Sequence, residues 1–490
     1  MRFNEFLNSK KGLLIAPAGH GKTHAIATCV KMSDDKHVQL ILTHTHAGIA
    51  SLRSKLNSLG VSKQKYIIET ICGFAQKITF AYTPFVTIPE QTDKEYFKYV
   101  VNRATNLIDK KSVQNVLINS YHGVFIDEYQ DCSIEQHKLI MKLAKLMPSH
   151  ILGDELQGIY DFADKLVDFS RDLSDYNNFS FLNEPWRWEC DGNCKELGQK
   201  ILNCRKILLT NQISYKLVHD KNAHFYVFQH DSDRTGKYYS AVRNLVEQVK
   251  DDSVLIILPT YYDNQNWLRG GIEDRAKFRK QSGLEYTFSL IEAIDDKSFY
   301  SISEDIDTFV TSVKRIHKKE KRLFEILAKC SFNKTALAEW IDHQNSNIKN
   351  KRGDNNPLSN DLKRRCEILF VDNTLKNFLP IIEFFTIKLK YRPKRPELLY
   401  SLIKSISMAI KNNNSVFNCM IEYKNIIRHT GRKIKGRCIG TTLLTKGLEF
   451  DTVIIVDAHL FTDKKNFYVA ISRACKNLII LTEDINLTIN

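Results

Sequence analysis

The stretch Leu13-Leu14-Ile15-Ala16-Pro17-Ala18-Gly19-His20-Gly21-Lys22-Thr23 decides how the rest of the chain is interpreted. An apolar run leads into a loop of small residues, and an apolar-periodic segment follows from Ala25. This order predicts a strand, a phosphate-binding loop and a helix, because backbone N–H groups and a helix N-terminus together surround phosphate. Lys22 would reach the β- and γ-phosphates of a nucleotide, and the Thr23 hydroxyl would hold Mg²⁺. The loop departs from the usual pattern in having Ala16 where the first glycine is expected.

Length and composition limit the class of protein. The chain has 490 residues, 43% hydrophobic and 26% charged, which is typical of a globular protein with about two to four domains. It contains no apolar run of about 18 residues, and the polar start from Met1 to Lys11 leaves no room for a signal peptide, so we expect a cytoplasmic protein with no membrane partner. The 11 cysteines lack metal-ligand spacing and are interpreted as reduced thiols. The net charge of +15 favours a polyanionic partner such as nucleic acid.

Further apolar runs predict more strands. Val38 to Leu42 is interpreted as a buried strand that ends at Thr43-His44-Thr45-His46, and Ile68 to Ala75 as a loop that opens a helix. Gly123 to Ile126 and Ile151 to Leu152 have the same build as the first strand. Repeated strand–loop–helix units predict an α/β fold with a parallel sheet and ligands at the carboxyl ends of its strands.

Two adjacent acids, Asp127 and Glu128, follow the strand at Gly123 to Ile126. A strand that ends in paired acids is the second half of a phosphate-loop ATPase site. Asp127 would hold Mg²⁺ through its water shell, and Glu128 would orient and deprotonate the attacking water. A solvated acidic turn is the plainer alternative, but the phosphate loop at Lys22 makes it much less favoured.

Five further blocks carry a resemblance to a known family. They are Asp127-Glu128-Tyr129-Gln130-Asp131, Gly153-Asp154-x-x-Gln157-x-Ile159-Tyr160-x-Phe162, Leu182-Asn183-Glu184-Pro185-Trp186-Arg187, Thr441-Thr442-Leu443-Leu444-Thr445-Lys446-Gly447-Leu448-Glu449-Phe450 and Tyr468-Val469-Ala470-Ile471-Ser472-Arg473-Ala474. In this order they resemble the motifs of superfamily 1 helicases of the UvrD/Rep type. The resemblance implies two RecA-like P-loop NTPase domains with parallel sheets, plus mainly helical insertions.

The resemblance also implies an ATP site divided between the two domains. Arg187 and Arg473 would come from the second domain and neutralise charge on the γ-phosphate, which Gln157 would sense. Trp186 would stack on the adenine and Glu449, beside Gly447, would bind the ribose. The implied cofactors are ATP and Mg²⁺. The implied DNA contacts are Thr43, His44, Thr45, Thr70, Phe74, Tyr160, Phe162 and Thr441.

The expected domain boundaries follow from the same blocks. Residues 1–80 and 121–180 would form the first RecA-like domain, with a small helical insertion at 81–120. Residues 181–265 and 436–490 would form the second. Residues 266–435 turn helical and basic, and are expected to be an accessory insertion with a loop at Asn345 to Asn360 and a linker-like break at Tyr391 to Pro396.

Some positions depart from the family's motifs and leave alternatives open. His44 stands where a DNA-stacking phenylalanine is usual, and Leu443 replaces a histidine that usually contacts DNA. ATPase activity is therefore better supported than processive unwinding. The main hypothesis is an ATP-dependent helicase or translocase on single-stranded or tailed DNA, with 3′–5′ polarity from the family alone. The alternative is a non-unwinding switch that senses nucleotide or DNA and activates a nuclease partner, and an RNA helicase is less favoured.

The chain is short for this family. In size and loosely in motifs it resembles the helicase-like (GajB-like) subunits of Gabija anti-phage defence systems. That resemblance implies an OLD-type ATPase–nuclease (GajA-like) subunit as a partner.

Overall fold

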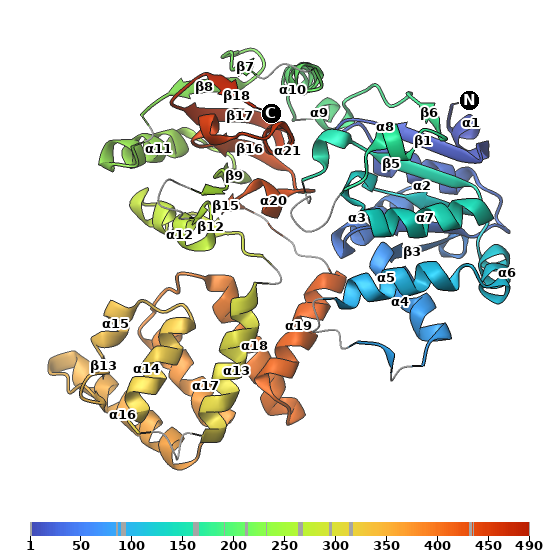
Figure 1. The fold of residues 1–490 in the computed structure, drawn as a ribbon. Coiled ribbons are helices and arrows are strands. Elements are labelled where there is room, and N and C mark those ends of the chain that lie inside the picture. Colours follow the sequence, from blue (N-terminus) through green and yellow to red (C-terminus); the bar gives the residue numbers. More distant parts are fainter. Residues whose placement is uncertain are drawn as a thin grey trace. The chain divides into compact units, whose positions relative to one another are not determined.

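The computed structural model describes residues 2–84, 87–89, 95–159, 166–190, 192–210, 214–231, 233–262, 268–293, 296–312, 317–430, 434 and 436–489. The chain divides into two compact units (Figure 1). Unit 1 comprises Met1–Gly271 and Thr430–Asn490, and unit 2 comprises Ile272–His429. Within the described ranges, no helix has both the length and the apolarity needed to cross a membrane.

The first sheet of unit 1 is built from the N-terminal third of the chain. Its strands are β1 Lys11–Ile15, β2 Gln39–Thr43, β3 Tyr66–Thr70, β4 Gly123–Ile126, β5 Ser149–Gly153 and β6 Asn177–Phe179. All neighbours are parallel, in the order β3-β2-β4-β5-β1-β6. The helices around it are α1 Arg2–Asn8, α2 Lys22–Met32, α3 His46–Ser58, α4 Ile71–Tyr82, α5 Tyr96–Leu107, α6 Lys111–Ser120, α7 Ile134–Leu146 and α8 Phe169–Asp172.

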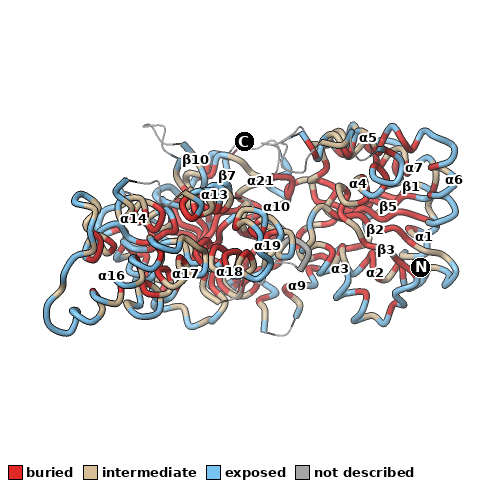
Figure 2. Tube along the Cα trace, turned by 90° about the horizontal axis from the view of Figure 1, so that it is seen from below, coloured by how far each residue is buried: buried red, intermediate tan, exposed pale blue. Residues whose placement is uncertain are grey.

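Alternating side chains of these strands fill two cores, one on each face of the sheet. Leu14 and Phe125 belong to one core, and their neighbours Leu13 and Val124 belong to the other. This alternation follows from the two-residue period of a strand, and burial of both faces explains why the strands are almost wholly apolar. Figure 2 shows these strands as buried segments.

The strand order brings three loops together. Because β5 lies between β1 and β4, the loops that follow these three strands leave the same edge of the sheet side by side. These are the phosphate loop, the Gln157 loop and the acidic turn. The segment Ile68 to Ala75 was expected to be a loop that opens a helix. Its first three residues instead belong to strand β3 (Tyr66–Thr70), and the helix begins directly after that strand at Ile71.

The second sheet of unit 1 is formed by segments on both sides of unit 2 in the sequence. In unit 1 it has the parallel order β15-β9-β16-β17-β8. Its strands are β8 Phe225–Gln229, β9 Val254–Ile257, β15 Arg437–Gly440, β16 Phe450–Ile455 and β17 Ala474–Thr482. The other elements are α9 Trp186–Glu189, α10 Lys195–Leu208, β7 Ser214–Lys216, α11 Gly236–Gln248, β10 Tyr261–Tyr262, β11 Leu268–Arg269, α20 Thr442–Thr445, α21 Lys464–Ile471 and β18 Asn486–Thr488.

Unit 2 is mainly helical and has its own core, to which Phe299, Leu327, Phe378 and Ile406 belong. Its elements are α12 Ile272–Gln281, β12 Ser289–Leu290, α13 Lys297–Ser312, α14 Lys319–Lys329, α15 Lys334–Ala338, β13 Ile341–Asp342, β14 Asn347–Ile348, α16 Asn356–Val371, α17 Leu375–Glu383, a π-helical turn Phe384–Lys388, α18 Pro396–Asn412 and α19 Val416–Thr430. The loop expected at 345–360 is shorter than predicted, because β14 lies within it and α16 begins at Asn356 with a proline in its first turn.

The expected α/β fold with two parallel sheets and mainly helical insertions is confirmed. Helices α5 and α6 lie in the range 81–120, and unit 2 occupies most of 266–435. Below, the first-sheet region means residues 2–180, and the second-sheet region means residues 181–271 and 430–489. Both belong to unit 1.

Candidate nucleotide-binding site

The phosphate loop joins β1 to α2. Gly19 and Gly21 have φ angles of 71° and 85°, in the left-handed region that favours glycine. Ala16 is fully buried in the core beside α2, so its methyl group packs where the usual pattern has a glycine. The Lys22 ammonium donates hydrogen bonds to the carbonyls of Ala16 (2.9 Å) and Pro17 (3.3 Å). The backbone of the loop therefore surrounds the ammonium group of Lys22.

His20 and Ala18 complete this loop. The Nδ1 atom of His20 lies 2.8 Å from the Ala18 carbonyl, and the ring is 2% exposed. Burial lowers the pKa of His20, and the nearby charge of Lys22 lowers it further. His20 is thus a neutral packing residue of the loop at physiological pH.

The acidic turn lies beside the phosphate loop. The N–H of Asp127 donates to the Leu42 carbonyl (2.9 Å), and the N–H of Glu128 donates to the Asp127 carboxylate (3.0 Å). Glu128 has a φ of 54°, a left-handed conformation that costs a non-glycine residue about 1–3 kcal/mol. Such strain is held only where the surroundings fix it, and here it aims two carboxylates into one buried site.

The two carboxylates differ in their protonation. Burial raises the pKa of Asp127 to about 7, and the Glu128 carboxylate adds to the rise. Burial alone would also raise the pKa of Glu128, but the charges of Lys22 and Lys446 hold it below its usual value. Gln130 also donates a hydrogen bond to Glu128 through its side-chain amide. Glu128 is therefore the ionised partner, as a general base must be.

The donor set of this corner suits Mg²⁺. The carboxylate of Asp127 and the hydroxyl of Thr23, at the start of α2, are hard oxygen ligands. A bound divalent cation would favour the ionised form of Asp127, which burial and the neighbouring Glu128 disfavour. Among the residues that the structure describes, no group of three or more His, Cys, Asp or Glu could hold a metal by itself.

The Gln157 loop follows β5 and connects to the acidic turn. The Gln157 amide donates to Asp154 Oδ2 (2.9 Å), and the N–H of Asp154 donates to Gln130 Oε1 (2.9 Å). Gln130 therefore contacts both Glu128 and the Gln157 loop. A change at the acidic turn can be passed to Gln157 through these hydrogen bonds.

Asp154 also pairs with an arginine of the second-sheet region. Arg205 on α10 donates to Asp154 Oδ1 at 2.8 Å, and the Asp154 side chain has no exposed surface. Burial alone would raise the pKa of Asp154, but Arg205 and Lys22 together hold it below its usual value. No motif in the sequence points to Arg205, because its pairing with Asp154 depends on tertiary structure.

Arg187 of the second-sheet region lies directly on the phosphate loop. The backbone N–H of Arg187 donates to the Gly19 carbonyl (3.0 Å). A Cβ atom added at Gly19 would lie only 2.8 Å from the Arg187 Cβ. Its guanidinium pairs with Glu449 (2.8 Å) and donates to the Ser472 carbonyl (2.6 Å). Its Nε is buried without a hydrogen-bond partner among the described residues. A phosphate oxygen is a partner that this N–H could take.

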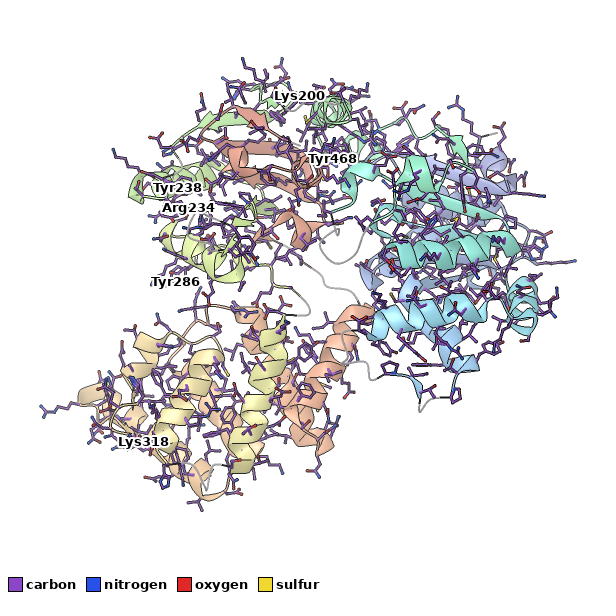
Figure 3. All side chains as sticks on the ribbon, viewed as in Figure 1. Lys200, Arg234, Tyr238, Tyr286, Lys318 and Tyr468 are labelled. Atoms are coloured by element: carbon purple, nitrogen blue, oxygen red, sulfur yellow. The ribbon has the colours of Figure 1, made fainter. Side chains whose placement is uncertain are left out.

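Arg473 and Tyr468 approach the same site. Arg473 is 1% exposed and donates to the Val469 carbonyl (2.9 Å) and to Ser472 Oγ (2.7 Å). Burial lowers the pKa of Arg473 to about 10, which leaves it charged at neutral pH. The Tyr468 hydroxyl, on α21 (Figure 3), accepts a hydrogen bond from the Ala18 N–H (3.1 Å).

Lys446 makes a second buried connection between the two regions. Its ammonium donates to Asp131 Oδ2 (2.6 Å) and to the Gln157 carbonyl, and both charged side chains are less than a tenth exposed. Lys446 and Asp131 lie in two of the motif blocks, and no role was predicted for either residue. Their opposite charges in two motif blocks are the signal that could have paired them.

The residues assigned to the base and ribose lie at the rim of the loop. Trp186 is 58% exposed, and a Cβ at Gly21 would lie 3.4 Å from its Cδ1. Glu449 has a half-exposed side chain, and Gly447 has a φ of 79°. An exposed indole beside a phosphate loop can stack on a nucleotide base.

The residues that were expected to contact DNA differ in how far they are exposed. Thr45 is exposed and caps α3, whereas Thr43 and Thr441 are buried. Thr70 is buried and caps α4 by accepting from the Gly73 N–H. Tyr160 and Phe162 lie outside the described residues.

Two of these assignments conflict with the geometry. Phe74 is 3% exposed and packs in the core between α4 and the sheet, so it has no surface for DNA. Its spacing from Ile71 and Ile78 is that of a buried helix face, a signal present in the sequence. His44 is turned towards the acidic turn, where its Nε2 lies 3.3 Å from Cys132 Sγ.

Comparison with protein families matches the N-terminal part of the chain. The family model of an AAA domain matches residues 3–163, about a third of the chain. No curated protein matched. Among solved structures, the chain is similar to the DEAH/RHA helicase HrpB of Escherichia coli, with 11% identity and a TM-score of 0.30 over 59% of this chain. The match spans 30% of the length of that helicase.

The class of protein follows from the family model and the geometry together. Residues 3–163 match an AAA domain and hold a phosphate loop, an acidic turn and a buried glutamine loop at one sheet edge. The N-terminal region is therefore similar to AAA domains and carries the elements of a phosphate-loop ATPase site.

Proposed function

We propose that the protein is an ATP-dependent DNA helicase or single-strand translocase. The observation that carries the proposal is the position of Arg187, which donates from the second-sheet region to Gly19 of the phosphate loop. A site completed by a sequence-distant region couples nucleotide chemistry to the relative position of two regions. That coupling is what a motor requires.

The residues have distinct roles in hydrolysis. Lys22 binds the β- and γ-phosphates, and Thr23 and Asp127 hold Mg²⁺, which neutralises phosphate charge when it is bound. Glu128 accepts the proton of the attacking water. Arg187 and Arg473 neutralise the charge that develops on the γ-phosphate, and Gln157 senses this phosphate.

Nucleic acid as the partner is supported by charge and by the motifs. The net charge of +15 favours a polyanion. The motif blocks resemble those of UvrD/Rep-type helicases, from which the proposed DNA specificity and 3′–5′ polarity are taken. The proposed physiological setting is that of a helicase-like subunit beside an OLD-type ATPase–nuclease, as in Gabija systems.

The first test is ATP hydrolysis with and without single-stranded DNA. Lys22→Ala and Glu128→Gln should each abolish DNA-stimulated hydrolysis, by a factor of about 100 or more. Lys31→Ala, an exposed lysine in the last turn of the same helix α2, is the matched control and should leave hydrolysis unchanged. Normal turnover by the two site variants would refute the assignment.

A second candidate function is a non-unwinding switch that activates a nuclease. The position of His44 favours it, because a side chain bonded to Cys132 is not presented to DNA. Strand displacement on duplexes with a 3′ or a 5′ tail separates the two functions. Displaced strand from the 3′-tailed duplex supports the helicase, whereas ATP turnover without displacement, alone and with a nuclease subunit, supports the switch.

A further inference from the structure

One aromatic ring of unit 2 stands in solvent. Tyr286 is 76% exposed, more than any other large apolar or aromatic side chain in the described part of the chain (labelled in Figure 3). Leu284 and Phe288, two residues away on either side, are each 3% exposed. The turn is thus anchored by two buried side chains, while the ring between them is held out. An exposed aromatic ring offers a flat apolar face on which an unpaired base can stack.

A guanidinium covers part of this ring. The Arg392 Cζ lies 4.4 Å from the centroid of the Tyr286 ring. Arg392 is exposed, and Pro393 follows it and restricts its backbone. A guanidinium stacked on an aromatic ring is a favourable pair that leaves the donor N–H groups in its plane free for phosphate. We call this pair the Tyr286–Arg392 platform.

A buried arginine joins the two segments of the platform. Arg279, on α12, is 6% exposed and donates to the carbonyls of Phe288 (3.3 Å) and Lys394 (3.2 Å). These carbonyls lie two residues from Tyr286 and two residues from Arg392. The segments are therefore tied to each other through one side chain.

A second arginine fixes the Arg392 segment to the body of unit 2. Arg395 pairs with the fully buried carboxylate of Glu292 (2.7 Å) and with Asp296 (3.2 Å). The neighbouring Lys394 N–H donates to the Ser331 carbonyl (2.9 Å). A platform held this firmly loses little conformational freedom on binding a ligand.

The surroundings of the platform are basic. The segments 277–287 and 390–394 carry one exposed acid, Glu285, against five exposed cations, which are Lys277, Lys280, Lys390, Arg392 and Lys394. An exposed ring among cations matches a ligand with flat apolar faces and a polyanionic backbone.

We propose that the Tyr286–Arg392 platform is a binding site for single-stranded DNA. An unpaired base would stack on the Tyr286 ring, and Arg392 and Lys394 would contact the flanking phosphates. Duplex DNA is not suited, because its base faces are already stacked on their neighbours. The choice of DNA rests on the proposed function, whereas the stacking site rests on the geometry of unit 2.

The test separates base stacking from phosphate contact. The full-length protein without ATP is titrated with a fluorescent oligothymidylate of about 20 nucleotides, and with an abasic strand of the same length, by anisotropy. The wild type should prefer the strand with bases. Tyr286→Ala should weaken oligothymidylate binding about fivefold or more and leave abasic binding unchanged. Tyr286→Phe, which keeps the ring, should bind as the wild type does.

The phosphate contacts have a different signature. Arg392→Gln combined with Lys394→Gln should weaken both strands alike and reduce the salt dependence of binding. Tyr400→Ala is the matched control for Tyr286→Ala, because Tyr400 is 54% exposed with Lys404 5.4 Å from its ring, but it lies on helix α18. This control should bind both strands normally.

Two results would overturn the platform. One is oligothymidylate binding by Tyr286→Ala that equals the wild type, and the other is a loss in Tyr286→Phe as large as in Tyr286→Ala. Both are distinct from failure of the proposed function. DNA binding is measured without ATP, so the two proposals can fail separately. If binding depends on the Tyr286 ring but the protein has no ATPase activity, only the motor function is refuted. If DNA stimulates the ATPase activity but Tyr286→Ala binds DNA as the wild type does, only the platform is refuted.

Discussion

Replacing Arg205 by methionine tests whether the buried pair with Asp154 joins the two regions of unit 1. The substitution keeps much of the side-chain volume and removes the charge. Asp154 would then keep the hydrogen bond from Gln157 and its hydrogen-bond contact with Tyr468 but lose its cation partner, in a position with no exposed surface. We expect both stability and ATP hydrolysis to fall.

The size of the effect follows from burial. Removing one partner of a buried ion pair costs about 3–5 kcal/mol, because the other charge is left uncompensated. The Arg205 side chain is 11% exposed, so some water can reach the site, and the lower end of about 3 kcal/mol applies. The double variant Arg205→Met with Asp154→Asn removes both charges and should cost less than Arg205→Met alone.

Urea unfolding of the full chain, followed together with ATPase turnover, provides the measurement. Lys206→Met, an exposed lysine next to Arg205 on α10, removes the same charge and is the matched control. The folded pKa of Asp154 is depressed, so its stabilisation is full above its unfolded pKa of about 3.9 and is lost as the pH falls through the folded value. The difference between wild type and Asp154→Asn should therefore shrink in acid. A cost of Arg205→Met below about 1 kcal/mol, no larger than the control, would refute the reasoning.

The remaining predictions concern the other connections of the site. Lys446→Met should lower ATP turnover about tenfold or more with a smaller change in KM, because it breaks the ion pair with Asp131 and leaves the phosphate loop intact. Adding Asp131→Asn to this variant should recover stability in urea, and a double variant without that recovery would contradict the pairing. Cys132→Ala should cost about 1 kcal/mol in thermal unfolding, whereas Cys132→Ser, which keeps a hydrogen-bonding partner for His44, should retain the stability; equal behaviour of the two variants would exclude the bond. Chelation of Mg²⁺ should abolish hydrolysis and added Mg²⁺ should restore it, and turnover that persists in chelator would refute the metal role of Thr23.

The strands and turns of the first-sheet region could be predicted because they are local signals. A strand buried on both faces is a continuous apolar run, so β4 was visible in the sequence together with the acids that end it. The phosphate loop could also be predicted from a local signal, because positive φ angles such as that of Gly21 favour glycine. Edge strand β3 alternates between buried and exposed positions and was mistaken for a loop.

Contacts between the two regions could not be predicted in the same way. Arg205 is one of several cations on α10, and only the folded chain shows that it meets Asp154, 51 residues earlier. Lys446 meets Asp131 across 315 residues. Phe74 was misassigned because motif position was preferred over helical spacing, and packing against the sheet decided its place.

The pairing of β9 with β15 explains how unit 2 can be inserted in the sequence between two neighbouring strands of the second sheet. The two strands are parallel, with Val254 opposite Arg437, so the chain must travel back along the sheet between them. A connection between two parallel strands needs a dozen residues or more, and the sheet sets no upper limit on its length. Lengthening it is inexpensive, since each doubling of a closed loop costs about 0.6 kcal/mol. In the sequence, unit 2 thus occupies the position of an ordinary crossover connection, where a whole folded body can be inserted without changing the register of the paired strands.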